Sequence, residues 1–141
     1  MGDIRNDDRR EKSFTLHPSM ETLAQLEAGI EEFMEEQGIS VSQANKMNIA
    51  VDEIFSNIVS YSGADRAQVL CRIDAKEILV IFRDDGIPYD PLNQATPDLS
   101  KPLEERSVGG LGIFMTRRLM SEVAYDYLDG YNQMTLILER S

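Results

Sequence analysis

Apolar residues recur every three or four positions in two long stretches of the chain, which is the spacing of one helical face. The first stretch begins after Ser19, a residue type suited to an N-cap, and ends near Gly38. We therefore predict an amphipathic helix whose buried stripe is Leu23, Leu26, Ile30, Phe33 and Met34.

The second stretch begins at Ser40 and Gln43, which have the spacing of a capping box. It predicts a helix that runs to about Ser62, where Gly63 can end it in the left-handed conformation. The apolar face of this helix is predicted to hold Met47, Val51, Ile54, Phe55, Ile58 and Tyr61.

Elsewhere the apolar residues alternate with polar ones, which indicates half-buried strands. Such strands are predicted at 13–16, at 67–73, at 78–82, and on both sides of a hairpin turn at 129–132 that contains Asp-Gly. A third helix, from Gly110 to about Glu122, carries Leu111, Phe114, Met115 and Leu119. This order predicts an α+β fold, a two-layer sandwich with helices on one face of a mixed, mostly antiparallel sheet.

Two segments lack any period. Residues 1–12 are densely charged and are expected to form a flexible N-terminal arm, so that a single domain occupies 13–141. Residues 87–108 combine prolines with mixed charge, and a segment of that length inside a compact domain is usually functional. We expect a lid over a binding site near 89–108.

Composition narrows the class of partner. The net charge of −11 argues against a nucleic acid and against an anionic membrane surface, because both are bound through Lys and Arg. No apolar stretch approaches the length of a membrane span, and the N-terminus is charged where a signal peptide would be apolar. The single Cys71 excludes an internal disulfide and is expected to fill the core of a cytoplasmic protein.

The first candidate site is on the second helix. Glu53 and Asn57 lie four residues apart, so both side chains share one helical face beside the apolar residues. A partly desolvated carboxylate can act as a base, and the carboxamide oxygen can bind Mg²⁺. Taken alone, this segment is more simply interpreted as a solvated helix edge.

The second candidate is the acidic turn that follows the strand at 78–82. An apolar strand that runs into Asp84, Asp85 and Gly86 places a carboxylate at the floor of a pocket, and glycine allows close backbone approach. An ionised carboxylate only accepts hydrogen bonds, so it can recognise the amino group of adenine. We assign this role to Asp84 and expect Asp85 to face solvent; an ordinary acidic turn is the alternative.

The third candidate is the glycine cluster of Gly109, Gly110 and Gly112 at the start of the third helix. Backbone amides at a helix start can bind phosphate oxygens, aided by the helix dipole. Neither the P-loop lysine nor a preceding strand is present, and a glycine pair alone is most often a hinge. Among the nearby basic residues, Arg106 is the best placed to reach a terminal phosphate.

Together and in this order, the three segments resemble the N, G1 and G2 boxes of the Bergerat-fold ATPases. That superfamily includes histidine kinases, type II topoisomerases and mismatch-repair ATPases. Within it, the chain most resembles the anti-sigma factor serine kinases, through AVDEIFSNI at 50–58, PYDP at 88–91, GGLGI at 109–113 and Asn132 before the last strand. The resemblance covers nearly the whole chain from residue 14 onward.

The resemblance implies a site for Mg-ATP. Glu53 would be the general base that activates a serine hydroxyl of a partner, and Asn57 would ligate Mg²⁺. Gly110 and Gly112 would surround the phosphates, and Arg106 would steady the transferring group. The lid is longer than in some family members, which puts the role of Arg106 in question.

At the other end of the nucleotide, Asp84 would bind the adenine amino group and Gly86 would shape the pocket. The superfamily often has glycine where this chain has Pro88, a change that stiffens the lip of the pocket.

The resemblance also implies partners. The chain would phosphorylate a serine of an anti-sigma factor antagonist of the STAS fold, bind a sigma factor and form a homodimer. Two alternatives stay open: an ATP-dependent binding module that transfers no phosphate, and a detached histidine-kinase catalytic domain. The latter needs a phosphoacceptor histidine on a dimerisation helix, and His17 beside Pro18 is poorly suited to that role.

Overall fold

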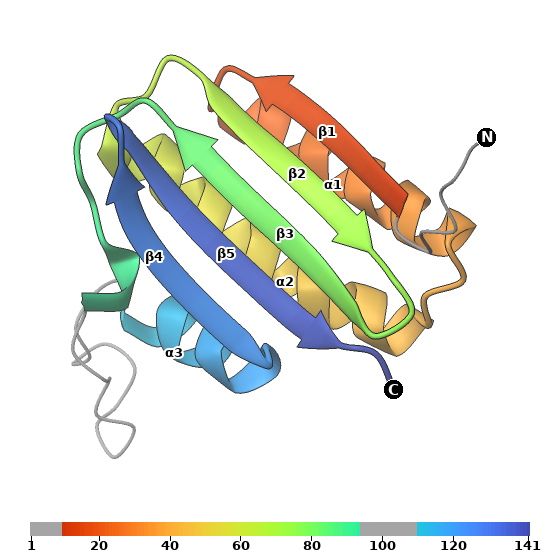
Figure 1. The fold of residues 1–141 in the computed structure, drawn as a ribbon. Helices are drawn as coiled ribbons and strands as arrows, with labels where there is room; N and C mark the ends of the chain where they lie inside the picture. The colour runs from red at the N-terminus through yellow and green to blue at the C-terminus, as the bar shows by residue number, and fades with distance from the viewer. Residues whose placement is uncertain (1–9, 94–109) are drawn as a thin grey trace.

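A computed structural model describes residues 10–93 and 110–141, which form two layers (Figure 1). One layer is a five-stranded sheet in which every neighbouring pair of strands is antiparallel. The sequence predicted a mixed, mostly antiparallel sheet; among the described strands the sheet is fully antiparallel, so the mixed part of that prediction was wrong. In spatial order, the strands are β1 (Arg10–Leu16), β2 (Ala67–Ile73), β3 (Glu77–Asp84), β5 (Tyr131–Glu139) and β4 (Glu122–Leu128).

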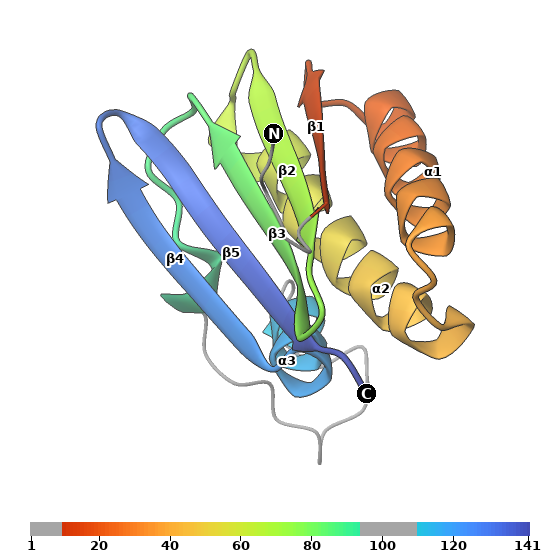
Figure 2. The same ribbon diagram turned by 45° about the vertical axis from the view of Figure 1, so that its right-hand side comes forward.

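The helices form the other layer and cover one face of the sheet, as predicted (Figure 2). They are α1 (Met20–Glu36), α2 (Val41–Asn57) and α3 (Gly110–Leu119). A π-helical turn, η1 (Ile58–Ser62), continues α2, and a short 3₁₀ turn, η2 (Pro91–Asn93), follows β3. None of the described helices has the length and apolar composition needed to cross a membrane.

The start of α1 is fixed by a reciprocal capping box. Ser19 Oγ accepts from Thr22 N at 3.1 Å, and Thr22 Oγ1 accepts from Ser19 N at 3.0 Å. The five apolar residues predicted for this helix are the ones it buries. At α2 only half of the predicted box forms, because Gln43 Nε2 donates to Glu139 O at 2.8 Å instead. That bond ties the start of α2 to the end of β5.

The strands alternate as the pattern predicted, with Ala67, Val69, Cys71, Ile73, Ile78, Val80 and Phe82 all buried. Burial also raises the pKa of the Cys71 thiol to about 12, so Cys71 is an inert core residue.

The β4–β5 turn contains only Asp129 and Gly130, whose φ values of 55° and 85° are those of a type I′ hairpin. The predicted turn was too long, because Tyr131 and Asn132 already belong to β5.

Strand β1 begins at Arg10, three residues before the predicted start at 13. Its first residues are polar, so hydrophobic alternation does not detect them. They pair with β2, and Arg72 Nε donates to Glu11 Oε2 at 2.6 Å. Pairing with β2, which no local pattern predicts, therefore extends the strand to Arg10.

Two predicted helix faces differ from the structure. Tyr61 is 46% exposed because the π turn adds a residue to the helical repeat, and Ser62 is buried in its place. In α3, which ends at Leu119 and not near Glu122, the buried residues are Ile113 and Thr116, and Met120 is buried directly after the helix. The predicted Leu111, Phe114, Met115 and Leu119 are half-buried or exposed, because contact with α2, and not local hydrophobicity, sets the inner face.

Candidate functional site

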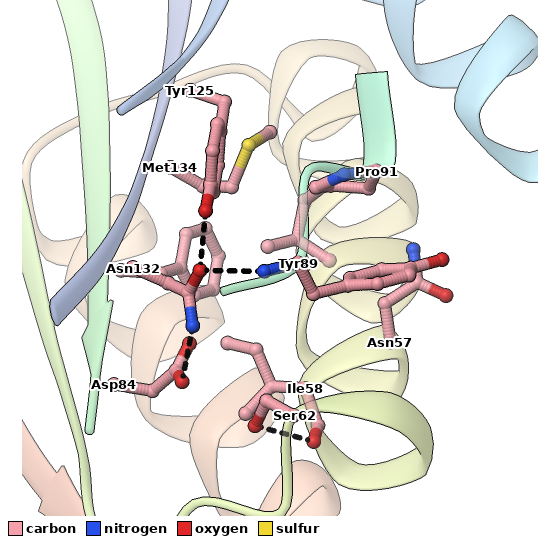
Figure 3. A pocket seen from close by; sticks show the side chains of 11 residues that line it. Asn57, Ile58, Ser62, Asp84, Tyr89, Pro91, Tyr125, Asn132 and Met134 are labelled. Carbon is pink, nitrogen blue, oxygen red and sulfur yellow. Dashed lines mark hydrogen bonds between the residues drawn. The ribbon is translucent and has the colours of Figure 1, made fainter. Parts of the chain in front are cut away.

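Asp84 ends β3 as a buried carboxylate, only 3% exposed. Its Oδ1 accepts two hydrogen bonds, from Gly86 N and from Asn132 Nδ2, each at 3.0 Å. Oδ2 has no hydrogen-bond partner among the described residues, and Asp84 lines the cavity drawn in Figure 3. Asp84 therefore lines that cavity with one carboxylate oxygen that no described residue binds.

Asp85 lies on the other side of the strand end and is exposed. Successive side chains of a strand point in opposite directions, so only one of the two aspartates can reach the cavity. Asp85 Oδ1 instead accepts from the amides of Asp65 and Arg66, at 3.0 and 3.2 Å. The structure separates the two acidic residues as the sequence suggested.

Gly86 is required by a close approach of the backbone. A Cβ atom at this position would lie 2.2 Å from Ser62 O, the carbonyl that accepts from Ile87 N at 2.8 Å. No side chain fits there unless the backbone moves. Gly86 thus lets the chain after β3 pass directly against the π turn at the end of α2.

Asn132 is the centre of the hydrogen-bond network in Figure 3. It lies opposite Asp84 in the β3–β5 register and is 5% exposed. Its Nδ2 donates to Asp84 Oδ1 and to Ile87 O, and its Oδ1 accepts from Tyr89 N and from the Tyr125 hydroxyl. Sequence analysis placed Asn132 in a turn, because the cross-strand register that gives it this role has no local signal.

The cavity is bounded by α2, η1, the sheet and the chain after β3, and its volume is about 20 Å³. That is room for about one water molecule. The Tyr89 ring stacks on the Tyr61 ring, with centroids 5.1 Å apart and planes inclined by 25°. The lining residues are Ile54, Asn57, Ile58, Ser62, Phe82, Asp84, Tyr89, Pro91, Tyr125, Asn132 and Met134.

Glu53 and Asn57 lie one turn apart on α2, as their spacing predicted, and Asn57 Nδ2 donates to Glu53 Oε2 at 3.1 Å. Burial raises the pKa of the Glu53 carboxyl; the Asn57 hydrogen bond lowers this pKa, and the nearby Asp52 charge raises it. The net shift is upward, so Glu53 accepts a proton more readily than an ordinary carboxylate. A solvated helix edge would not produce this environment.

Gly112 lies directly against the Glu53 carboxylate. A Cβ atom at Gly112 would come within 1.9 Å of Glu53 Oε1. The first turn of α3, which begins at Gly110, therefore faces the pair on α2. The structure thus brings the first and third sequence segments together at one place.

The donor set suits a metal that also binds phosphate. No group of three or more His, Cys, Asp or Glu residues suited to a metal occurs among residues 10–93 and 110–141. Mg²⁺ commonly takes one or two protein oxygens together with substrate phosphates and water. The Asn57 amide nitrogen faces Glu53, and no described residue donates to its Oδ1, so this oxygen could serve as such a ligand.

Arg106, Gly109 and Lys101 lie outside the described residues. Both arginines of α3 contact other residues: Arg117 Nη2 donates to Leu92 O at 3.2 Å, and Arg118 lies 5.6 Å from the centre of the Phe114 ring. Both side chains are exposed.

Comparison with known proteins identifies the family of this chain. Residues 16–138 match the family described as Histidine kinase-like ATPase domain. Over 94 residues, the chain is 31% identical to Serine/threonine-protein kinase BtrW of Bordetella bronchiseptica, an alignment that covers 64% of this chain and 66% of that kinase.

The fold also resembles the crystal structure of the RsbU and RsbW domains of a Mycobacterium tuberculosis protein, with a TM-score of 0.66 and 17% identity. That superposition covers 94% of this chain and 33% of the mycobacterial chain. The chain thus spans just under two thirds of the length of the kinase and one third of the solved protein. Since the family match runs from the end of β1 to the end of β5, the chain belongs to the histidine kinase-like ATPase domain family.

Proposed function

We propose that the chain is an ATP-binding anti-sigma regulatory factor that phosphorylates a serine of a STAS-domain antagonist and binds a sigma factor. The observation that carries the proposal is the placement of Glu53 and Asn57 on α2, facing Gly112 at the start of α3. A carboxylate with a raised pKa there, beside an amide that can hold a metal, suits phosphoryl transfer. Similarity to a serine/threonine-protein kinase supports this reaction class.

Asp84 would recognise the adenine base. Its free Oδ2 is a hydrogen-bond acceptor in a buried setting, which suits the exocyclic amino group of adenine. The cavity of about 20 Å³ is far smaller than typical ligand pockets of about 300–1,000 Å³. Nucleotide binding would therefore move the Tyr89 ring away from Tyr61, while the Tyr89 N–H keeps its bond to Asn132 Oδ1.

The transfer would use Glu53 as the general base. The serine oxygen of the partner would bond to the γ-phosphorus while the bond from that phosphorus to the β–γ bridging oxygen breaks, and ADP leaves. The serine proton would pass to the Glu53 carboxylate. Backbone amides at Gly110 and Gly112 would hold the phosphates, assisted by the positive end of the α3 dipole. Arg106, which lies outside the described residues, is proposed to contact the terminal phosphate.

Mg²⁺ would be held by Asn57 together with the phosphates, where it would neutralise phosphate charge. The orientation of the Asn57 amide is set by a residue of this chain. Glu53 orients the amide of Asn57 through the 3.1 Å hydrogen bond, which leaves the carbonyl oxygen available for the metal.

The proposed partners follow from the family resemblance and from charge. A sigma factor is a basic, DNA-binding protein, and the net charge of −11 would speed its encounter with this chain. High salt should therefore slow association. We further propose that the chain acts as a homodimer in the cytoplasm, without direct contact to nucleic acid or membrane.

The proposal is tested by incubating the purified chain with Mg-ATP and a STAS-domain protein of the same organism. Phosphoserine on that protein, detected by mass spectrometry, is the expected result. A parallel binding assay with candidate sigma factors, with and without ATP, tests the second part. Stable complexes without phosphoserine after hours of incubation would instead favour the non-catalytic binding module. If the chain does not bind ATP, both versions of the proposal fail.

A further inference from the structure

We propose that Asn132 is a positioning residue for nucleotide recognition: it holds the Asp84 carboxylate in one orientation and links it to the backbone on both sides of Pro88. This inference rests on the proposed ATP site. In this proposal Asn132 does not contact the nucleotide itself. Recognition of adenine nevertheless depends on this side chain of β5, because it orients Asp84.

The hydrogen-bonding capacity of the Asn132 side chain is fully used within the protein. A carboxamide has two donor hydrogens and two acceptor lone pairs. Nδ2 donates to Asp84 Oδ1 at 3.0 Å and to Ile87 O at 2.8 Å, while Oδ1 accepts from Tyr89 N at 2.9 Å and from the Tyr125 hydroxyl. None of these groups is left to bind a ligand.

These partners also fix which way the amide faces. Asp84 Oδ1 and Ile87 O are both acceptors, so only the NH₂ group can face them. Tyr89 N is a donor, so only the carbonyl can face it. In a flipped amide, the carbonyl oxygen would face the two acceptors Asp84 Oδ1 and Ile87 O and could form a hydrogen bond with neither. Asn132 is only 5% exposed, and a buried polar group without a partner is costly.

The fixed amide determines which oxygen Asp84 offers. Asn132 and Gly86 both bind Oδ1, which prevents the carboxylate from rotating and leaves Oδ2 as the free acceptor. Because the carboxylate is buried, this orientation is maintained in a region of low dielectric constant, where hydrogen bonds are stronger than in water.

The same amide holds the chain that follows. It binds the carbonyl before Pro88 and the N–H after it, and proline itself has no N–H that would need a partner. The proline that departs from the superfamily pattern is therefore compatible with this network. One side chain thus connects base recognition to the first residues beyond β3.

The test compares the binding of ATP with that of inosine triphosphate by calorimetry, since hypoxanthine carries an oxygen in place of the amino group that Asp84 would recognise. The wild-type chain should bind ATP more tightly than inosine triphosphate. Asn132→Ala should lower ATP affinity about 10- to 100-fold, as expected for a lost buried bond to a charged group. Its affinity for inosine triphosphate should stay within about threefold of the wild-type value, so that the preference for ATP shrinks.

Tyr125→Phe keeps the ring but removes the hydroxyl that binds Asn132 Oδ1, so it should reduce ATP preference less than Asn132→Ala does. This variant also covers the case in which Asn132→Ala does not fold. Gln133→Ala, the neighbouring residue of β5 on the other face of the sheet, is the matched control and should change neither affinity.

Equal losses for both nucleotides in Asn132→Ala, or ATP binding that is unchanged in it, would overturn the positioning role. For Tyr125→Phe, an unchanged ATP preference or an equal loss for both nucleotides would do the same. If the wild-type chain binds neither nucleotide, the proposed ATP site fails first, which is a different result from losing only the preference.

Discussion

The two ends of the candidate site hold their carboxylates in different ways. At the end proposed for adenine, Asp84 is 3% exposed and one of its oxygens accepts two hydrogen bonds from fixed groups. At the end proposed for phosphate, Glu53 is half-buried, accepts one bond from Asn57 and packs against Gly112. Burial also raises the pKa of Glu53.

The difference matches the tasks proposed for the two ends. Recognition of a base needs an acceptor that does not move, and a network spanning β3 and β5 provides one. Proton transfer needs a carboxylate that can take up a proton, and a raised pKa with few competing hydrogen bonds favours that. Mutations at the two ends should therefore affect binding and catalysis separately.

The largest effect is expected from Glu53→Gln. Loss of the general base should lower the rate of serine phosphorylation about 10²- to 10⁴-fold, while ATP affinity stays within about threefold. Glutamine can still accept the Asn57 bond, so the local structure should be kept. Single-turnover transfer to the STAS-domain protein measures the rate, with Glu31→Gln on α1 as the control. An unchanged rate would show that Glu53 is not the base.

At the other end, Asp84→Asn should act on binding. Replacing the carboxylate by an amide removes a charge-assisted acceptor and should weaken ATP binding about 10- to 100-fold. The control is Asp85→Asn, because the neighbouring side chain is exposed and its Oδ1 can still bind the amides of Asp65 and Arg66. Calorimetry with Mg-ATP measures both variants. Equal affinities in the two would contradict the assignment of Asp84.

Gly86→Ala should affect both stability and binding. Its Cβ would meet Ser62 O at 2.2 Å, and overpacking of this kind costs about 1–3 kcal/mol. Gly38→Ala is the matched control: a residue with φ of +78° is strained by a side chain, but there is open space around it and it lies far from the cavity. Urea unfolding should show that both variants are destabilised, whereas only Gly86→Ala should lose ATP affinity. Unaltered affinity in Gly86→Ala would argue against a role of Gly86 in shaping the nucleotide pocket.

The smallest effect concerns pH. Because the pKa of Glu53 is raised, the transfer rate should fall as pH decreases through that pKa, at a higher pH than for an ordinary glutamate. The Asp52 charge contributes to raising the pKa of Glu53, so Asp52→Asn should move this acidic limb to lower pH. Asp52 also hydrogen-bonds Glu27 on α1, a contact that asparagine can keep. Rates measured across the pH range test this, and a limb that does not move would exclude the Asp52 contribution.

Much of the fold could be predicted from local patterns. The buried stripe of α1, the alternation of β2 and β3, the left-handed Gly63 and the Asp-Gly hairpin all depend on residues close together in the sequence. The pairing of Glu53 with Asn57 has the same origin, because a spacing of four is one helical turn. Periodicity and turn chemistry are local, so the sequence carries them directly.

What local patterns missed depends on contacts between distant segments. The start of β1 is set by its pairing with β2, and the inner face of α3 by its contact with α2. The π turn moves Tyr61 outward to stack with Tyr89, far along the chain. In each case a neighbouring element determines which residues are paired or buried, and the local hydrophobic pattern does not predict this.

The order of helices and strands and the residue types of the candidate site follow from local patterns in the chain. How those residues meet depends on the packing of the elements: antiparallel register places Asn132 opposite Asp84, and helix packing places Gly112 against Glu53. The two kinds of information differ in how far apart in the sequence the interacting residues lie. Helix and strand periods act over a few residues, whereas the geometry of this site depends on pairing between segments that are about 50 to 60 positions apart in the chain.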